Sequence, residues 1–175
     1  GDNPGFAHAP RKQDLSQHIV DLMRAGMVQL VALEIDFRAA KMLGQLDVAE
    51  AAYQGALEAF EARVGAKSME VGIILSNLAG LQEARKDYPA AIETQARSCE
   101  ILEELLGLEH PNSVLTAGNL AGMKYRGGVH GGLIEAYDQL IPRQESVLGP
   151  RRPEVGVSYM TRGSLLLQAG DEERA

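Results

Sequence analysis

A spacing of 42 residues runs through this 175-residue chain and restricts the folds that it can adopt. Gly65, Gly107 and Gly149 follow one another at that interval, each directly after an apolar residue. Further pairs at the same interval are Pro111 and Pro153, Asn77 and Asn119, Leu78 and Leu120, Ala79 and Ala121, and Gly128 and Gly170. A period between roughly 20 and 50 residues is typical of repeat architectures, in which each unit packs only against its neighbours. The sequence therefore predicts a solenoid.

Each unit of this repeat predicts two amphipathic helices. In the second unit, the predicted inward positions are Leu75, Leu78, Ala79 and Gln82 on the first helix and Ala91, Cys99, Leu102 and Leu106 on the second. These residues recur at the spacing of one helical face. We expect Gly107 to end the second helix as a left-handed cap. Pro111 and Pro153 are expected at first helical positions, because proline has no backbone N–H to lose there.

The interval also divides the chain. We expect a flexible N-terminal segment over residues 1–11, an extra amphipathic helix over 12–26 and a repeat domain over 27–175. The extra helix either caps the first repeat, since end repeats need covering, or contacts a partner. The predicted repeats are 27–65, 69–107, 111–149 and 153–175, the last of which is truncated before its second helix. We interpret the chain as a piece of a longer solenoid.

Composition excludes several classes of function. The apolar content of 45% is sufficient for a folded core, and the formal net charge is −7. Nucleic acid is an unsuitable partner, because its binding needs a basic face that neutralises phosphates. The single cysteine excludes an internal disulfide framework. No apolar run is long enough for membrane insertion. We expect an intracellular, cytoplasmic protein, with an organelle after removal of a transit peptide as the alternative.

The sequence offers no recognisable catalytic or cofactor site. His8, His18, His110 and His130 share no metal-ligand spacing. The glycine-rich stretch 127–132 lacks the Gly-Lys-Ser/Thr of a phosphate loop. Cys99 is interpreted as a small core residue. We therefore expect no enzyme activity, no metal and no cofactor.

Three segments of the second unit and of the linker after it resemble a known family of repeats. The segments 75–81, 86–91 and 103–111 together resemble a tetratricopeptide repeat, and the long period with a Leu-Gly-x-x-His-Pro linker resembles the version in kinesin light chains. The resemblance covers residues 27–175. It implies an all-α fold, a right-handed α-solenoid of tetratricopeptide-like helix pairs with about three full repeats plus part of a fourth. It also implies that the first helices line a concave groove that binds a partner peptide.

The groove positions are transferred by the matched motif and are expectations of the resemblance. They are Ile73, Ser76, Asn77, Gly80 and Glu83 in the second repeat, Leu115, Gly118, Asn119, Gly122, Tyr125 and Arg126 in the third, and Thr161 in the fourth. Asn77 and Asn119 are the main candidates, because an amide can pair with both backbone groups of one peptide residue. Alternatively, each asparagine braces a neighbouring helix. The three glycines indicate close approach of either a ligand or a helix.

Some positions depart from the repeat. In the end copies, Ile35 and Thr161 replace the asparagine, and Asp36 and Arg162 replace the following leucine. A charge at a core position is costly unless it is paired or exposed. We therefore expect the groove to be best defined in the middle repeats. Gln95 stands where Tyr53 and Tyr137 supply an aromatic ring, and we expect it to loosen the second repeat.

The favoured function is a non-catalytic scaffold or adaptor that binds a protein or peptide partner in the groove. Two alternatives remain open. One is a structural subunit packed permanently in a large organellar or cytoskeletal assembly. The other is the sensor arm of a larger signalling ATPase. A fold hosts many functions, so the sequence does not identify the partner.

Overall fold

The computed structural model describes residues 46–170. Over that range the regular structure is entirely helical, with α3 (Leu46–Val64), α4 (Met69–Ala84), α5 (Tyr88–Leu106), α6 (Pro111–Arg126), α7 (Leu133–Leu148) and α8 (Pro153–Gln168). The predicted segments 1–11 and 12–26, the first helix of the first repeat with Ile35 and Asp36, and residues 171–175 lie outside the described residues. None of the described helices is both long and apolar enough to cross a membrane.

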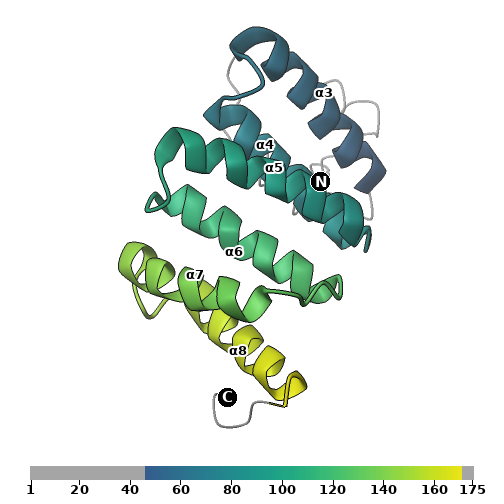
Figure 1. Ribbon diagram of the computed structural model, residues 1–175. Coiled ribbons are helices and arrows are strands. Elements are labelled where there is room, and N and C mark those ends of the chain that lie inside the picture. Colours follow the sequence, from purple (N-terminus) through teal and green to yellow (C-terminus); the bar gives the residue numbers. More distant parts are fainter. Residues whose placement is uncertain (1–45, 171–175) are drawn as a thin grey trace, which may run out of the picture.

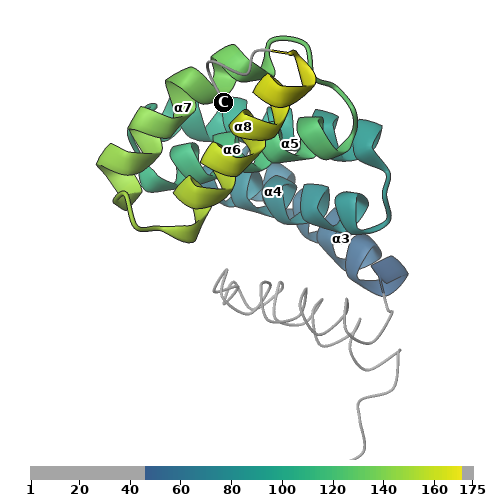
Figure 2. The same ribbon diagram turned by 90° about the horizontal axis from the view of Figure 1, so that it is seen from below.

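The helices form a stack that follows the order of the sequence (Figure 1). Each helix packs against the next one, and α6 also packs directly against α8. Figure 2 shows the same stack from the α8 end. These contacts join helices that are close in the sequence, so each helix is stabilised by its near neighbours in the chain, as in repeat proteins. This arrangement confirms the predicted all-α solenoid of helix pairs.

Burial repeats with the sequence interval. Ala49, Ala91 and Leu133, which share one repeat position, are exposed by only 7%, 0% and 3%. A second repeat position holds Tyr53, Gln95 and Tyr137, which are exposed by 2%, 0% and 1%. Residues that share a repeat position are thus buried alike in successive helix pairs, even where the residue is the polar Gln95.

Gln95 satisfies both ends of its amide inside the core. Its Nε2 donates to the backbone carbonyl of Thr116 at 3.0 Å, and its Oε1 accepts from Ser76 Oγ at 3.2 Å. The amide of α5 therefore joins α4 to α6. The expectation that Gln95 loosens the second repeat is wrong, because a buried polar group with its hydrogen bonds made carries little penalty and fixes the register of its neighbours.

Arg162 shows how the fourth unit accommodates a charge at a predicted core position. Its Nε lies 2.5 Å from Asp138 Oδ1, so α8 is paired with α7 there. The Arg162 side chain is 24% exposed, which leaves part of it in contact with water. The charge is thus paired and partly exposed, and both conditions lower the cost of burying it.

The turn inside each helix pair uses the left-handed backbone conformation at one repeat position. Lys86, Gly128 and Gly170 have φ values of 65°, 77° and 72°. After α4, the N–H of Asp87 donates to the carbonyl of Gln82 at 2.9 Å, which satisfies a carbonyl at the end of the helix. This left-handed conformation suits glycine, so Lys86 holds a strained backbone that the other two turns avoid.

The linkers between pairs turn at a different glycine position. Gly65, Gly107 and Gly149 have φ values of 91°, 83° and 93°. Gly107 has ψ 163° and Gly149 has ψ 144°. Gly107 is therefore not the left-handed cap that the sequence predicts. Its backbone is extended at positive φ, a region that is essentially restricted to glycine.

Side-chain or proline caps fix the starts of α4, α5, α6 and α8. The capping bonds run from Val71 N to Ser68 Oγ at 3.2 Å, from Ala90 N to Asp87 Oδ1 at 3.3 Å, and from Asn112 N to His110 Nδ1 at 3.1 Å. Pro111 and Pro153 are the first residues of α6 and α8, as their position in the repeat predicts. His110 is thus a capping residue of the linker.

Cys99 lies in the core, as its repeat position predicts. It is exposed by 6% on α5. Burial raises the pKa of its thiol from 9.0 to about 11, because the thiolate loses its hydration there. The thiol therefore stays protonated and unreactive near neutral pH.

We predict that Lys86→Gly stabilises the protein. Glycine relieves the left-handed strain at this turn but adds freedom to the unfolded chain, so we expect a net gain of up to about 1 kcal/mol in the free energy of unfolding. Urea unfolding followed by circular dichroism measures it. The reciprocal Gly128→Lys should lose a similar amount, and a loss of stability in Lys86→Gly would contradict the strain.

We also predict that native Cys99 resists alkylation. At pH 8, the shift of pKa from 9.0 to about 11 lowers the thiolate fraction from about a tenth to about a thousandth. Iodoacetamide should therefore react about 100-fold more slowly with the native protein than with the urea-unfolded chain.

The same shift links stability to pH. The folded state favours the protonated thiol, so its contribution is complete below pH 9.0 and is lost as the pH rises towards 11. Wild type should lose more stability across this window than Cys99→Ala. Equal pH dependence in the two proteins would show that burial does not shift the thiol.

Candidate peptide-binding groove

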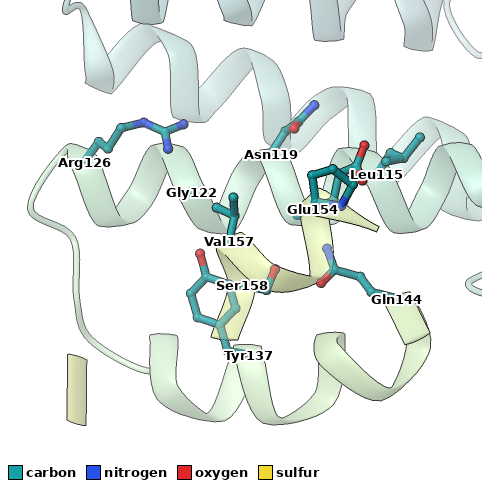
Figure 3. Close-up of a pocket in the computed structure, with 11 residues that line it drawn as sticks. Leu115, Asn119, Gly122, Arg126, Tyr137, Gln144, Glu154, Val157 and Ser158 are labelled. Carbon is teal, nitrogen blue, oxygen red and sulfur yellow. The ribbon is translucent and has the colours of Figure 1, made fainter. Parts of the chain in front are cut away.

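Two neighbouring pockets lie on the face formed by α4, α6 and α8. The α4–α6 pocket has a volume of about 470 Å³ and is lined by Ser76, Asn77, Gly80, Glu83, Ala84, Asn119, Met123 and Arg126. The α6–α8 pocket has a volume of about 280 Å³ and is lined by Leu115, Gly118, Asn119, Gly122, Arg126, Tyr137, Gln144, Pro153, Glu154, Val157 and Ser158 (Figure 3). Asn119 and Arg126 belong to both, so the two pockets adjoin along α6.

Asn77 and Asn119 lie on the walls of the same α4–α6 pocket. Asn119 is exposed, whereas the Nδ2 atom of Asn77 is buried and has no hydrogen-bond partner among residues 46–170. A buried donor without a partner is rare in folded proteins and calls for an explanation. Within the described part of the chain, this atom donates to no neighbouring helix.

An ion pair joins the two helices beside these asparagines. Arg126 Nη2 of α6 lies 2.6 Å from Glu83 Oε1 of α4, and Arg126 Nε donates to the same oxygen at 2.7 Å. The Arg126 side chain is 46% exposed and that of Glu83 is 24% exposed. The pair therefore neutralises the charge of both residues on the groove face and remains accessible to solvent.

Two of the groove glycines make room for side chains of this protein. A Cβ on Gly118 would lie 2.8 Å from Gln144 Nε2, which is closer than real Cβ contacts. A Cβ on Gly122 would lie 3.1 Å from Arg126 Nη1. At both positions, the close approach that the glycines predict comes from side chains that line the α6–α8 pocket.

Tyr137 forms part of the inner wall of the α6–α8 pocket, and its ring is 1% exposed. Burial raises the pKa of its phenol, mainly because the phenolate would lose its hydration. The hydroxyl therefore stays neutral near physiological pH. Within residues 46–170, no group of three or more His, Cys, Asp or Glu side chains could hold a metal ion.

Nine of the twelve predicted groove residues line these pockets, and three line neither. Ile73 is half-buried on α4. Tyr125 stacks on His130 with the ring centroids 5.4 Å apart. The Thr161 hydroxyl donates to the carbonyl of Val157 at 2.9 Å within α8.

Sequence reasoning missed Gln144, Glu154 and Ser158. These side chains enter the α6–α8 pocket from α7 and α8 (Figure 3). One signal was available for Gln144, because the equivalent position one repeat earlier is the fully buried Leu102. A polar residue at a buried apolar position of the repeat needs a partner, and at Gln95 neighbouring helices supply it.

Comparisons with known proteins agree with this geometry. The tetratricopeptide repeat family model matches residues 38–104. No curated protein matches the sequence. Among solved structures, BtubC (BKLC) from P. vanneervenii is similar with a TM-score of 0.73 and 17% identity, over 94% of this chain and 70% of that one.

A second similar structure is that of a protein from Podosopora anserina, which is described as a kinesin light chain with nearly identical TPR-like repeats. It matches with a TM-score of 0.63 and 16% identity, over 97% of this chain and 92% of that one. Its Q17M form matches with a TM-score of 0.64. The predicted resemblance is therefore confirmed: residues 38–104 match the tetratricopeptide repeat model, and the solenoid has the fold of kinesin light chain-like repeats.

Proposed function

We propose that this protein is a non-catalytic scaffold or adaptor that holds an extended peptide segment of a partner protein along α4, α6 and α8. Tetratricopeptide repeats generally serve as protein-protein interaction scaffolds. The free thiol at Cys99 suits a reducing compartment, so we place this function inside the cell, in the cytoplasm.

The observation that carries the proposal is the unpartnered Nδ2 of Asn77 beside Asn119. An extended peptide presents a carbonyl and an N–H at each residue, and an asparagine amide can pair with both. Two such amides on one pocket wall would hold the backbone of the peptide without reading its side chains. The contact would also satisfy the donor that the fold leaves unpaired.

The Glu83–Arg126 ion pair supports the same interpretation. Arg126 lines both pockets and Glu83 lines the α4–α6 pocket, so a peptide that passes from one pocket to the other would meet this pair. Because the two charges cancel, the middle of the groove favours neither sign of ligand charge. Recognition by backbone amides fits such a neutral surface better than recognition by charge alone.

A second candidate, a permanently packed structural subunit, is favoured by the apolar surface of α8. Val157, Tyr159, Met160 and Leu167 are exposed by 50%, 49%, 69% and 61%. Large exposed apolar residues gathered on one element mark interaction surfaces. An obligate subunit would bury this surface against another chain.

We predict that Asn77→Ala combined with Asn119→Ala weakens peptide binding. The probe is a peptide selected from a random library on the immobilised wild-type protein. Loss of two amide contacts should raise the dissociation constant at least about tenfold. Isothermal titration calorimetry measures it. Stability should not fall, because Asn77 contributes a buried donor without a partner.

The chain offers a matched control in Gln54→Ala combined with Gln139→Ala. This pair also removes two side-chain amides, but both are exposed, lie on α3 and α7, and line neither of the two pockets. The control should bind the peptide like wild type. If the asparagine and glutamine variants bind equally well, the groove is not where the peptide binds.

We further predict that the protein sediments as a monomer over a wide range of concentrations, as an adaptor should. Analytical ultracentrifugation decides between the two candidates. Concentration-dependent association that disappears in Met160→Gln combined with Leu167→Gln would instead favour the packed subunit, because it would assign association to the apolar surface of α8.

A further inference from the structure

Two glutamines are buried in the second helices of this solenoid, and they differ in one respect. Gln95 is fully buried with both ends of its amide bonded to neighbouring helices. Gln144 is exposed by only 1%, yet its Oε1 has no hydrogen-bond partner in the part of the chain that the structure describes. Burial of an unpaired amide oxygen destabilises a fold, whereas burial of a paired one does not. The packing of α7 therefore does not explain Gln144.

The repeat and a neighbouring glycine both point to a role for this amide. The equivalent position of the preceding repeat is Leu102, so an apolar side chain suits this place in the stack. Gly118 leaves room for Gln144, because a Cβ at this position of α6 would meet its Nε2 at 2.8 Å. Figure 3 shows the amide pointing from α7 into the space between α6 and α8. The fold thus directs the Gln144 amide, whose Oε1 lacks a hydrogen bond within the described residues, into the α6–α8 pocket.

A second unpaired acceptor lines the same pocket. The Glu154 side chain is 41% exposed, but its Oε2 atom is buried and accepts no hydrogen bond from residues 46–170. Its ion-pair partner is Arg152, whose Nε lies 3.7 Å from this oxygen, beyond hydrogen-bonding distance, and whose side chain is 56% exposed. Arg126, which also lines the pocket, is paired with Glu83. Among the described residues, the two buried atoms at this pocket that lack a hydrogen bond are therefore both acceptors, and they suit a ligand with several donors.

We propose that the α6–α8 pocket is the subsite for a lysine side chain of the bound peptide, an inference that rests on the proposed function. An ammonium group has three donors and no acceptor, which matches two unpaired acceptors. The apolar stem of lysine would lie against Leu115, Tyr137 and Val157. The volume of about 280 Å³ is below that of typical cofactor or drug sites and fits one side chain.

The test uses a lysine-containing peptide selected from a random library, and the same peptide with norleucine in place of lysine. Norleucine keeps the stem and removes the ammonium. On wild type, we expect lysine at one fixed position of the selected peptides and at least about tenfold weaker binding of the norleucine form. Gln144→Met and Glu154→Gln should each reduce this discrimination. An arginine form should bind more weakly than lysine, because the subsite fits the compact ammonium, and equal binding of the two would overturn that choice of ligand.

The control is Gln95→Met. Methionine resembles glutamine in shape, so neither substitution changes the packing much. Gln95→Met removes two hydrogen bonds, whereas Gln144→Met removes an amide whose Oε1 makes none among the described residues. Gln144→Met should raise the melting temperature while reducing discrimination between the lysine and norleucine peptides. Gln95→Met should lower the melting temperature and leave that discrimination unchanged. A lower melting temperature in Gln144→Met with unchanged discrimination would show that Gln144 is structural.

The outcomes separate the subsite from the groove. If the selected peptide needs Asn77 and Asn119 but binds equally well with norleucine, the lysine subsite is wrong and the groove stands. If the peptide does not need the asparagines, the groove proposal fails, and the subsite is tested directly by NMR. N-acetyl-lysine methylamide at millimolar concentration should then shift the side-chain amide signals of Gln144, and the norleucine analogue should not. Equal shifts, or none, would overturn the subsite.

Discussion

Each described helix buries its apolar side against helices close to it in sequence, and the rest of the structure depends on this constraint. Because successive helix pairs carry the same buried positions, one packing solution is repeated along the stack. The two turns of each unit are equally regular, one at Lys86 or its glycine equivalents and one at Gly107 or its equivalents. Regular turns keep the first helices on one face, and the two pockets lie on that face.

Polar groups inside this stack have two different functions. Gln95 is paired at both ends and links α4, α5 and α6, so it fixes how neighbouring units meet. Asn77 and Gln144 each keep one buried atom unpaired, and both residues line pockets on the same face. Unlike Gln95, Asn77 and Gln144 therefore keep hydrogen-bonding capacity at the pockets, and our proposal assigns it to the bound peptide.

The fold could be predicted from the sequence because its signals are periodic. The glycine interval, the apolar stripes and the helix-starting prolines each depend on local backbone chemistry, and the structure follows them. The conformation of Gly107 was predicted incorrectly, because a glycine after a helix indicates positive φ and does not determine ψ.

The site was predicted only in part, and for a physical reason. The motif transfers positions on α4 and α6, where first helices line the groove, and nine of those residues line the pockets. Gln144 enters the pocket from a second helix, so its role depends on the packing of α7 against α6 and α8. Likewise, the stabilising role of Gln95 depends on hydrogen bonds to Ser76 and Thr116, which lie on different helices. The 42-residue interval marks both glutamines as departures from the repeat, but it does not show which atoms of other helices they meet.

Our proposal is that the face of α4, α6 and α8 binds an extended peptide. A crystal structure of the protein with a peptide selected on it would show where the peptide lies. We expect a peptide backbone that runs along α6 with its carbonyl and N–H groups paired to the amides of Asn77 and Asn119. A peptide bound to the opposite face, along α3, α5 and α7, would contradict it.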